Sequence, residues 1–268
     1  GAGLGISGVA LQALFRNPLA EPGLIGVSSS AAFGAVFVIV LGGVIWQDVA
    51  VWQMSLSAFL AAAVSTVLLY SIATRNGHTD VALMLLTGVA FNAIAGALTQ
   101  LLITFSDDTQ LRSVMFWMMG SFANLSWESV TIALSLVSVS LIGLWRLVKP
   151  MNAFVLGENV CLQMGYEPKW FKWQVMGFSA LMVGAAVSVV GVIGFVGLVV
   201  PHIMRLWIGS DHRLVLPLSA LAGAILLVVA DLFARQILYP AELPIGLLMA
   251  LLGGPFFLML LLNKRRRI

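Results

Sequence analysis

Long uncharged apolar runs are the feature that most constrains how this chain can fold. Runs of about 20 residues recur from residues 24–46 to residues 243–262, and a helix needs about that length to cross a bilayer core of about 30 Å. Only 9% of the 268 residues are charged, whereas soluble domains carry about 25%. The chain is therefore predicted to be an all-α, polytopic membrane protein, because a membrane barrel alternates apolar and polar residues over short strands.

The runs predict nine membrane passes within a single transmembrane domain, residues 1–268. The first run starts at Gly1 without a methionine or a charged leader, so we expect it to be the remnant of a longer helix. Residues 173–209 are too long for one ordinary pass, and we expect the chain to turn back at the glycine-rich stretch 191–197. The nine passes are residues 1–15, 24–46, 51–74, 81–106, 127–148, 173–190, 192–209, 214–238 and 243–262.

The basic residues gather on one side of these passes. Of the 14 lysines and arginines, only Arg112 and Arg235 fall on the other side, which holds acidic residues such as Asp107 and Glu242. Cytoplasmic loops carry an excess of lysine and arginine, so the basic side, with the C-terminus, is predicted to be cytoplasmic. A single pass at 173–209 would put the basic tail outside, which also favours two passes there. The basic side holds Arg16, Arg75, Arg146, Lys149, Lys169, Lys172, Arg205, Arg213, Lys264, Arg265, Arg266 and Arg267.

A polar loop, KPMNAFVLGENVCLQMGYEPKWFK at residues 149–172, interrupts the apolar sequence on the predicted cytoplasmic side. Pro150 and Asn152 are predicted to close one helix and cap a short turn, and two glycines bracket a second helix at 158–164. The loop is either a stiff connection between passes or a plug that fits a groove of a cytoplasmic partner. The sequence contains no phosphate-binding motif, so energy for uphill transport must come from another subunit, which favours the plug.

Two further segments each carry a structural and a functional interpretation. Residues 16–34, rich in proline, glycine and serine, form either a plain interhelical turn or a moving gate at a pore mouth. Residues 107–121 predict a short helix, capped by Asp107 or Asp108 and ended by Gly120, which cannot span the membrane. It is either an interfacial helix or a re-entrant wall whose soft side chains line a wide path for a bulky ligand. The methionines in this helix are Met115, Met118 and Met119.

Isolated polar residues within the apolar runs have mainly structural interpretations. Asp231 and Arg235 are four residues apart and are predicted to neutralise each other near the outer end of a pass, where Arg235 can also reach an acidic partner. His202 has no second ligand nearby and is predicted to be a structural helix-end residue. Cys161 is the single cysteine, so no internal disulfide and no metal site are expected.

Six segments carry long motifs in a fixed order. They are SGVALQALFRNPLAEPGLIGVSSSAAFGA (7–35), LRSVMFWMMGSF (111–122), LGE (156–158), GFVGLVVPHIMRL (194–206), DHRLVLPLSALAGAILLVVAD (211–231) and ELPIGLLMALLGGPFFLMLL (242–261). In these motifs the chain resembles, over essentially its whole length, the FecCD-type permease subunits of binding-protein-dependent ABC importers for cobalamin, iron–siderophore complexes and haem. The resemblance implies a ten-helix permease fold that works as a two-fold dimer, with the first helix and the start of the second absent here.

The resemblance also implies roles for individual residues at both ends of the passes. Three residues of the polar loop would belong to the coupling helices that dock into a cytoplasmic ATPase subunit. Three residues in two cytoplasmic loops would gate the pathway, and one outer arginine would contact an acidic residue of a periplasmic binding protein. The coupling residues are Leu156, Gly157 and Glu158, the gate residues are Asn17, Leu19 and Thr79, and the docking residue is Arg235.

The function we expect is that of a homodimeric importer permease in a bacterial inner membrane, with no catalytic residue, metal or cofactor of its own. The partner ATPase dimer would use the ATP, a periplasmic protein would deliver the substrate, and no nucleic acid is involved. An alternative is a secondary transporter driven by an ion gradient. That alternative needs ionisable residues buried at mid-membrane, and only Asp231 approaches this. A membrane scaffold without transport is a second alternative, and the choice among the three chelates stays open.

Overall fold

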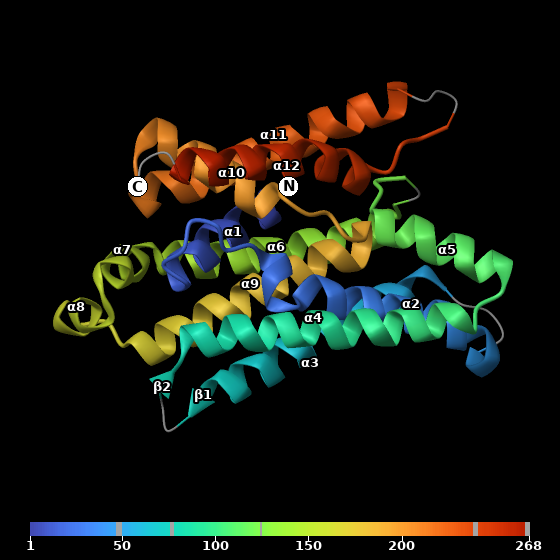
Figure 1. Ribbon diagram of the computed structural model, residues 1–268, viewed down its shortest axis with the longest axis horizontal. Helices are drawn as coiled ribbons and strands as arrows, with labels where there is room; N and C mark the ends of the chain where they lie inside the picture. The colour runs from blue at the N-terminus through green and yellow to red at the C-terminus, as the bar shows by residue number, and fades with distance from the viewer. Residues whose placement is uncertain (47–49, 76–77, 124, 238–240, 266–268) are drawn as a thin grey trace.

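The computed structural model describes residues 1–46, 50–75, 78–123, 125–237 and 241–265, which form a bundle of helices joined by short turns (Figure 1). The elements are α1 (Ala2–Leu14), a 3-10 turn (Pro22–Ile25), α2 (Val27–Trp46), α3 (Val51–Ala73), β1 (Thr74–Arg75), β2 (His78–Thr79), α4 (Val81–Thr104), α5 (Asp108–Met119), α6 (Trp127–Arg146), α7 (Val148–Leu156), α8 (Glu158–Gln163), α9 (Pro168–Val190), α10 (Val196–Ile208), α11 (His212–Ile237) and α12 (Ile245–Arg265).

Each of the nine predicted passes corresponds to one helix. Among the described residues, five helices are long and apolar enough to cross a membrane, namely α3, α4, α6, α9 and α11, and shorter apolar helices cover the other four passes. The segment 173–209 is divided into α9 and α10, as the glycine-rich stretch predicts. However, α10 has only 13 residues, about 20 Å at 1.5 Å per residue, because residues 191–195 are not helical. It is therefore shorter than the predicted pass.

Helix α1 lies at the centre of the bundle, against α9, α10 and α11. All its residues from Gly3 to Leu14 are buried, as expected of a helix without charges whose residues are all apolar or small except Gln12, and the Gln12 amide donates to the carbonyl oxygen of Gly197. A Cβ on Gly5 would lie 2.5 Å from the carbonyl oxygen of Ser219 in α11, and Gly8 lies similarly close to Gly197 of α10. Small residues thus let three backbones approach each other, which is how helices pack where lipid removes the hydrophobic driving force.

A second group of helices, α2, α3 and α4, packs beside α9. Ser57 of α3 donates its hydroxyl to the carbonyl oxygen of Gly34 in α2 at 2.7 Å, which ties the two helices at a point of close approach. The outward faces of α3, α4, α6 and α11 expose large apolar side chains along their length, such as Leu60, Leu86 and Ile225. These faces are suited to lipid, whereas a soluble protein rarely exposes such wide apolar surfaces.

The polar elements separate to the two ends of the bundle (Figure 1). One end carries α7, α8 and the two short strands, which pair antiparallel with Thr74 opposite Thr79. The other end carries α5, the short helix that follows α4. The first end holds residues predicted to be cytoplasmic and the second holds residues predicted to be on the outer side, so the site residues fall into two groups.

Candidate functional site

The polar loop predicted at 149–172 folds into a knuckle of two short helices, α7 and α8. Gly157 joins them with φ 141° and ψ 150°, a conformation open essentially to glycine alone. Gly165 ends the knuckle, also at positive φ, so the bracketing role predicted for both glycines is confirmed. The knuckle packs inward through Met151, Phe154 and Cys161. Leu156, which precedes Gly157, is 71% exposed and stands at the tip of the knuckle.

The prediction that Pro150 and Asn152 close one helix and cap a turn is wrong. Pro150 lies in the first turn of α7, where a missing N–H is tolerated because that group has no helical acceptor. Asn152 instead caps a distant helix: its Oδ1 accepts from the backbone N–H of His212 at 3.0 Å, and its Nδ2 donates to Asp211 at 2.7 Å. The backbone N–H of Arg213, followed by the Asn152 amide, holds the pKa of Asp211 below its usual value. Asn152 therefore ties the knuckle to the start of α11.

Glu158 forms an ion pair with Lys172 of α9 across the inner side of the knuckle. The Nζ of Lys172 lies 2.9 Å from each carboxylate oxygen of Glu158. The two partners differ in burial, since the Lys172 side chain is 2% exposed and that of Glu158 is 42% exposed. The ammonium also lies 5.8 Å from the centre of the Phe154 ring, within the range of a cation–π contact. Lys172 is thus a buried charge whose ion-pair partner comes from α8.

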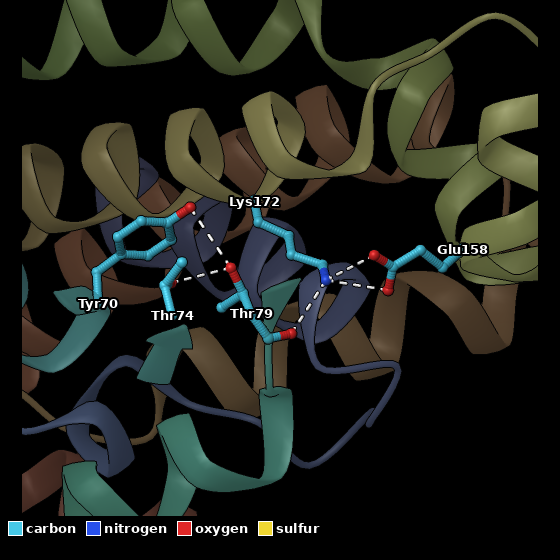
Figure 2. A network of polar contacts seen from close by, with 5 residues as sticks. All are labelled: Tyr70, Thr74, Thr79, Glu158 and Lys172. Carbon is cyan, nitrogen blue, oxygen red and sulfur yellow. Dashed lines mark hydrogen bonds and ion pairs between the residues drawn. The ribbon is translucent and has the colours of Figure 1, made fainter. Parts of the chain in front are cut away.

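Lys172 also reaches the turn between α3 and α4, where Thr79 lies (Figure 2). Its Nζ donates to the backbone carbonyl oxygen of Thr79 at 3.1 Å. The Thr79 hydroxyl lies 3.0 Å from that of Thr74 and 3.5 Å from the Tyr70 hydroxyl oxygen, so it is held within the turn. The next residue, Asp80, caps α4 by accepting from two backbone N–H groups. Thr79 and Glu158, predicted to serve in separate roles, are therefore joined through one lysine.

The other two predicted gate residues, Asn17 and Leu19, lie in the turn after α1. Arg16 adopts φ 47° there, and the Asn17 side chain accepts from the backbone N–H of Leu19 at 3.0 Å, a local turn of the kind asparagine favours. The Arg16 guanidinium stacks 4.5 Å from the centre of the Phe154 ring in α7. This turn therefore contacts the knuckle through Arg16, while within the part of the chain that the structure describes no hydrogen bond joins Asn17 or Leu19 to Thr79.

At the end of the bundle predicted to be on the outer side, Arg235 is held by two carboxylates. Its Nε lies 2.9 Å from Oδ2 of Asp231, four residues earlier, and its Nη1 lies 3.5 Å from Oε1 of Glu242. The predicted i, i+4 ion pair is confirmed, and Glu242 is a further partner that comes from the segment before α12. The Arg235 side chain remains 45% exposed, so it stays accessible to a protein that docks on this end.

The short helix α5 has the predicted caps. Asp107 accepts from the N–H of Gln110 at 2.8 Å, and Gly120 ends the helix with φ 67°. Of its apolar side chains only Val114 is buried, while all three methionines are exposed on the surface of the chain. A nearby cavity of about 560 Å³ is lined from α5 by Ser113, Phe116 and Trp117 rather than by these methionines.

No group of histidine, cysteine or acidic residues in the described part of the chain could hold a metal ion. His202 of α10 packs edge-on against Phe256 of α12, with ring centres 6.3 Å apart, and Cys161 is buried. Sequence reasoning did not single out Lys172 or Arg16, the two basic residues that contact Phe154. The only signal for them was their place among twelve basic residues of one side, which indicates neither the burial of Lys172 nor the contact of the exposed Arg16 with an aromatic ring.

Comparison with known proteins gives a consistent picture. A model of the FecCD transport family matches residues 1–263. The chain is 42% identical to the hemin transport system permease protein HmuU of Yersinia pestis, covering all of this chain and 80% of that protein. It is 44% identical to the vitamin B12 import system permease protein BtuC of Escherichia coli O9:H4 (strain HS), covering 99% of this chain and 80% of that one.

Two solved structures have the same fold as this chain. A structure described as an inward-facing conformation of a metal-chelate type ABC transporter superposes with a TM-score of 0.89 at 33% identity, covering 98% of this chain and 82% of that one. PsaBC from Streptococcus pneumoniae, solved with a Fab, superposes with a TM-score of 0.60 at 16% identity, covering 96% of this chain and 87% of that one. At that identity the second likeness concerns the fold alone.

Proposed function

Because the chain belongs to the FecCD transport family, we propose that two copies of it form the pathway through which an ATP-driven importer moves a bulky metal chelate. The chain is a multi-pass permease subunit of an ABC importer, like its haem and vitamin B12 relatives. It is not itself an enzyme. Its partners are an ATPase subunit and a substrate-binding protein. The secondary transporter is not favoured, because the relatives are named as subunits of transport and import systems.

The cargo in this proposal is haem, cobalamin or an iron–siderophore complex, and hemin and vitamin B12 are the cargoes in the names of the relatives. The chain itself carries no cofactor, and ATP is bound and hydrolysed by the partner subunit. A rigid chelate of this size needs a wide pathway with adaptable walls, and exposed methionines are side chains that adapt to irregular shapes. Met115, Met118 and Met119 on α5 therefore line the outer part of the pathway in this proposal.

The observation that carries the proposal is the knuckle of α7 and α8. Its tip residue, Leu156, is 71% exposed beside Gly157 and the partly exposed Glu158, at the end of the bundle where the basic residues gather. A short helix pair with an exposed apolar tip suits insertion into a groove of a second protein. In this proposal Leu156, Gly157 and Glu158 dock into the ATPase, and the loops of Asn17, Leu19 and Thr79 open and close the pathway behind them.

The outer end completes the proposal. Arg235 stays half-exposed although it pairs with Asp231 and Glu242, so it can exchange these partners for an acidic residue of the loaded binding protein. Such an exchange suits transient docking, because exposed ion pairs contribute little net stability and re-form readily. The membrane orientation in this proposal follows the basic residues, with the knuckle and the C-terminus in the cytoplasm of a bacterium with an inner membrane.

The proposal is tested by reconstituting the permease in proteoliposomes with its ATPase and binding protein. Replacing Leu156 and Glu158 together (Leu156→Ala, Glu158→Ala) should abolish uptake and the ATP hydrolysis that the loaded binding protein stimulates. Lys149→Ala serves as the control, because Lys149 is exposed on the same knuckle and should leave both activities unchanged. Unimpaired uptake by the double variant would remove the knuckle from the coupling mechanism, and uptake without any ATPase would refute the importer itself.

A further inference from the structure

The ammonium group of Lys172 is the meeting point of the knuckle and the turn that holds Thr79. A lysine has three N–H donors and no acceptor. Here its acceptors are the two carboxylate oxygens of Glu158 and the carbonyl oxygen of Thr79 (Figure 2). Within the described residues, no hydrogen bond joins α8 directly to the β1–β2 turn. The link between these two elements therefore passes through a side chain of a third element, α9.

The two partners of the ion pair differ in burial, and this difference determines how Lys172 responds when the knuckle moves. Lys172 is 2% exposed and Glu158 is 42% exposed, so water can solvate the carboxylate but not the ammonium. Taking the partner away from a buried ammonium is strongly destabilising, because the charge is left uncompensated. If the knuckle moves, Lys172 has to move with Glu158 or lose its only ion-pair partner among the described residues, and its bond to Thr79 changes at the same time.

The ring of Phe154 lies under the same junction. It is 1% exposed in α7 and has Lys172 on it at 5.8 Å and Arg16 at 4.5 Å from the ring centre. Arg16 directly precedes Asn17, the first residue of the other predicted gate. The knuckle thus contacts both gate loops through cations on one buried ring, but only the Thr79 loop is joined to it by an ion pair and hydrogen bonds.

We propose that Lys172 is the positioning residue that carries movement of the knuckle to the turn between α3 and α4. This inference rests on the proposed function, in which the ATPase moves the knuckle. The bidentate pair holds Glu158 in one geometry, and a change of conformation driven by the ATPase requires contacts that differ between the two states. The Lys172–Thr79 bond supplies such a contact at the gate. Lys172 itself touches neither ATP nor cargo.

The experiment compares Lys172→Met with Lys169→Met in the reconstituted importer. Lys169 lies three residues earlier on α9 and is exposed, so the same substitution there controls for loss of a lysine. Coupling free energies typically correspond to 5–150-fold effects, so we expect Lys172→Met to lower uptake about tenfold while stimulated ATP hydrolysis stays within about twofold of wild type. Lys169→Met should change neither rate.

A second measurement reports on the gate and not on folding. A spin label is placed at Leu83→Cys, an exposed residue in the first turn of α4, in a Cys161→Ser background. The distance between the labels of the two copies should change on ATP binding in the wild type and in Lys169→Met, and should not change in Lys172→Met. An unaltered ATP-driven change in Lys172→Met, or unaltered uptake, would overturn the inference.

Two additional variants separate the possible failures. If Lys172→Met does not assemble with the ATPase, Lys172→Gln replaces it, since its amide can still donate to Thr79 while the ion pair is lost. Glu158→Gln alone removes the same ion pair and should also lower uptake, and because Glu158 in addition docks into the ATPase it should lower stimulated ATP hydrolysis, which Lys172→Met should not. If Leu156→Ala with Glu158→Ala abolishes uptake while Lys172→Met does not, only this inference fails. If neither affects uptake, the proposed coupling role fails as well.

Discussion

Lys172 and Glu158 form an asymmetric ion pair in which only the acid reaches water. The buried ammonium of the lysine lies 5.8 Å from the centre of the Phe154 ring, and its hydrogen-bond partners are the carboxylate and one backbone carbonyl. Cys161 of α8 is also buried, in the same knuckle. The stability of this ion pair and the reactivity of this thiol both depend on which groups water can reach. Two measurements test this.

The two halves of the ion pair should differ in their effect on stability. Glu158→Gln leaves a buried ammonium without its counter-charge, for which we expect a loss of about 3 kcal/mol, the lower end of the range for broken buried pairs. Lys172→Met leaves a carboxylate that water can solvate, so we expect a loss of less than about 1 kcal/mol. Thermal unfolding of the purified permease in detergent measures both. Equal losses, or a larger loss in Lys172→Met, would contradict this account of the burial.

The Cys161 thiol should be unreactive in the folded protein. Burial raises the pKa of this thiol, and the negative charge of Glu158 raises it further. The thiolate is the reactive form, so a raised pKa means that less of it is present at any pH below that pKa than in an unfolded chain. We expect slow maleimide labelling at pH 8 in the native state and rapid labelling in denaturant. Equally rapid labelling in both states would show that the thiol is accessible.

At the scale of elements, the caps and breaks of the helices decide where the polar groups lie. Gly157 separates α7 from α8, Asp107 starts α5, and Asn152 of α7 caps the start of α11. Phe195 starts α10 at φ 68°, and its backbone N–H is accepted by the Glu21 carboxylate at 2.5 Å. The helices are thus joined at their ends by polar contacts from other helices and loops, whereas their sides pack through small and apolar residues.

The break at Gly157 should be sensitive to a single methyl group. At φ 141° an alanine is strained by about 1–3 kcal/mol, although the nearest atom to the new Cβ, in Val160, is a comfortable 3.6 Å away. Gly157→Ala should therefore destabilise the knuckle and lower stimulated ATP hydrolysis. The matched control is Gly177→Ala in α9, where no atom lies within 4 Å of the added Cβ and alanine stabilises a helix by about 0.5–1 kcal/mol. Thermal unfolding and ATPase assays measure both variants.

At the scale of the whole molecule, a single chain exposes apolar side chains over several of its helices. Helix α4 exposes large apolar side chains such as Leu86, Val89 and Leu101, and α5 exposes its three methionines. In the proposed dimer part of this surface faces a second copy across the pathway and part faces lipid. Water reaches the first region and not the second, which makes the two regions distinguishable by chemistry.

Cysteine labelling should separate pathway from lipid. Met118→Cys, in a Cys161→Ser background, should react with a membrane-impermeant maleimide added from the outer side, because a thiolate forms only where water is present. Leu134→Cys is the control on α6. Leu134 is more exposed on the single chain than Met118, at 63% against 40%, but it faces lipid in this arrangement, so it should not react. Docking of the binding protein should slow the labelling of Met118→Cys. Labelling of Leu134→Cys alone would reverse the assignment of the two surfaces.

The sequence by itself determined the helical elements and their local chemistry. The apolar runs predicted a helix for every pass. The Asp107 cap, the two glycines of the knuckle and the Asp231–Arg235 pair could also be predicted, because each depends on residues within a few positions of one another. The family motifs predicted the permease function, because each motif is a continuous stretch of the sequence.

Only the tertiary structure decided which polar groups meet. Lys172 is paired with a residue 14 positions away and bonded to another 93 positions away, and Asn152 caps a helix that begins 60 residues later instead of the turn predicted for it. The length of α10 could not be predicted either, because Gly191 and Gly194 indicate a turn but do not determine the residue at which the following helix begins. Such contacts depend on how whole helices pack, because packing determines which charged side chains are buried and which groups lie close enough to pair with them. The hydropathy of the sequence does not predict these contacts.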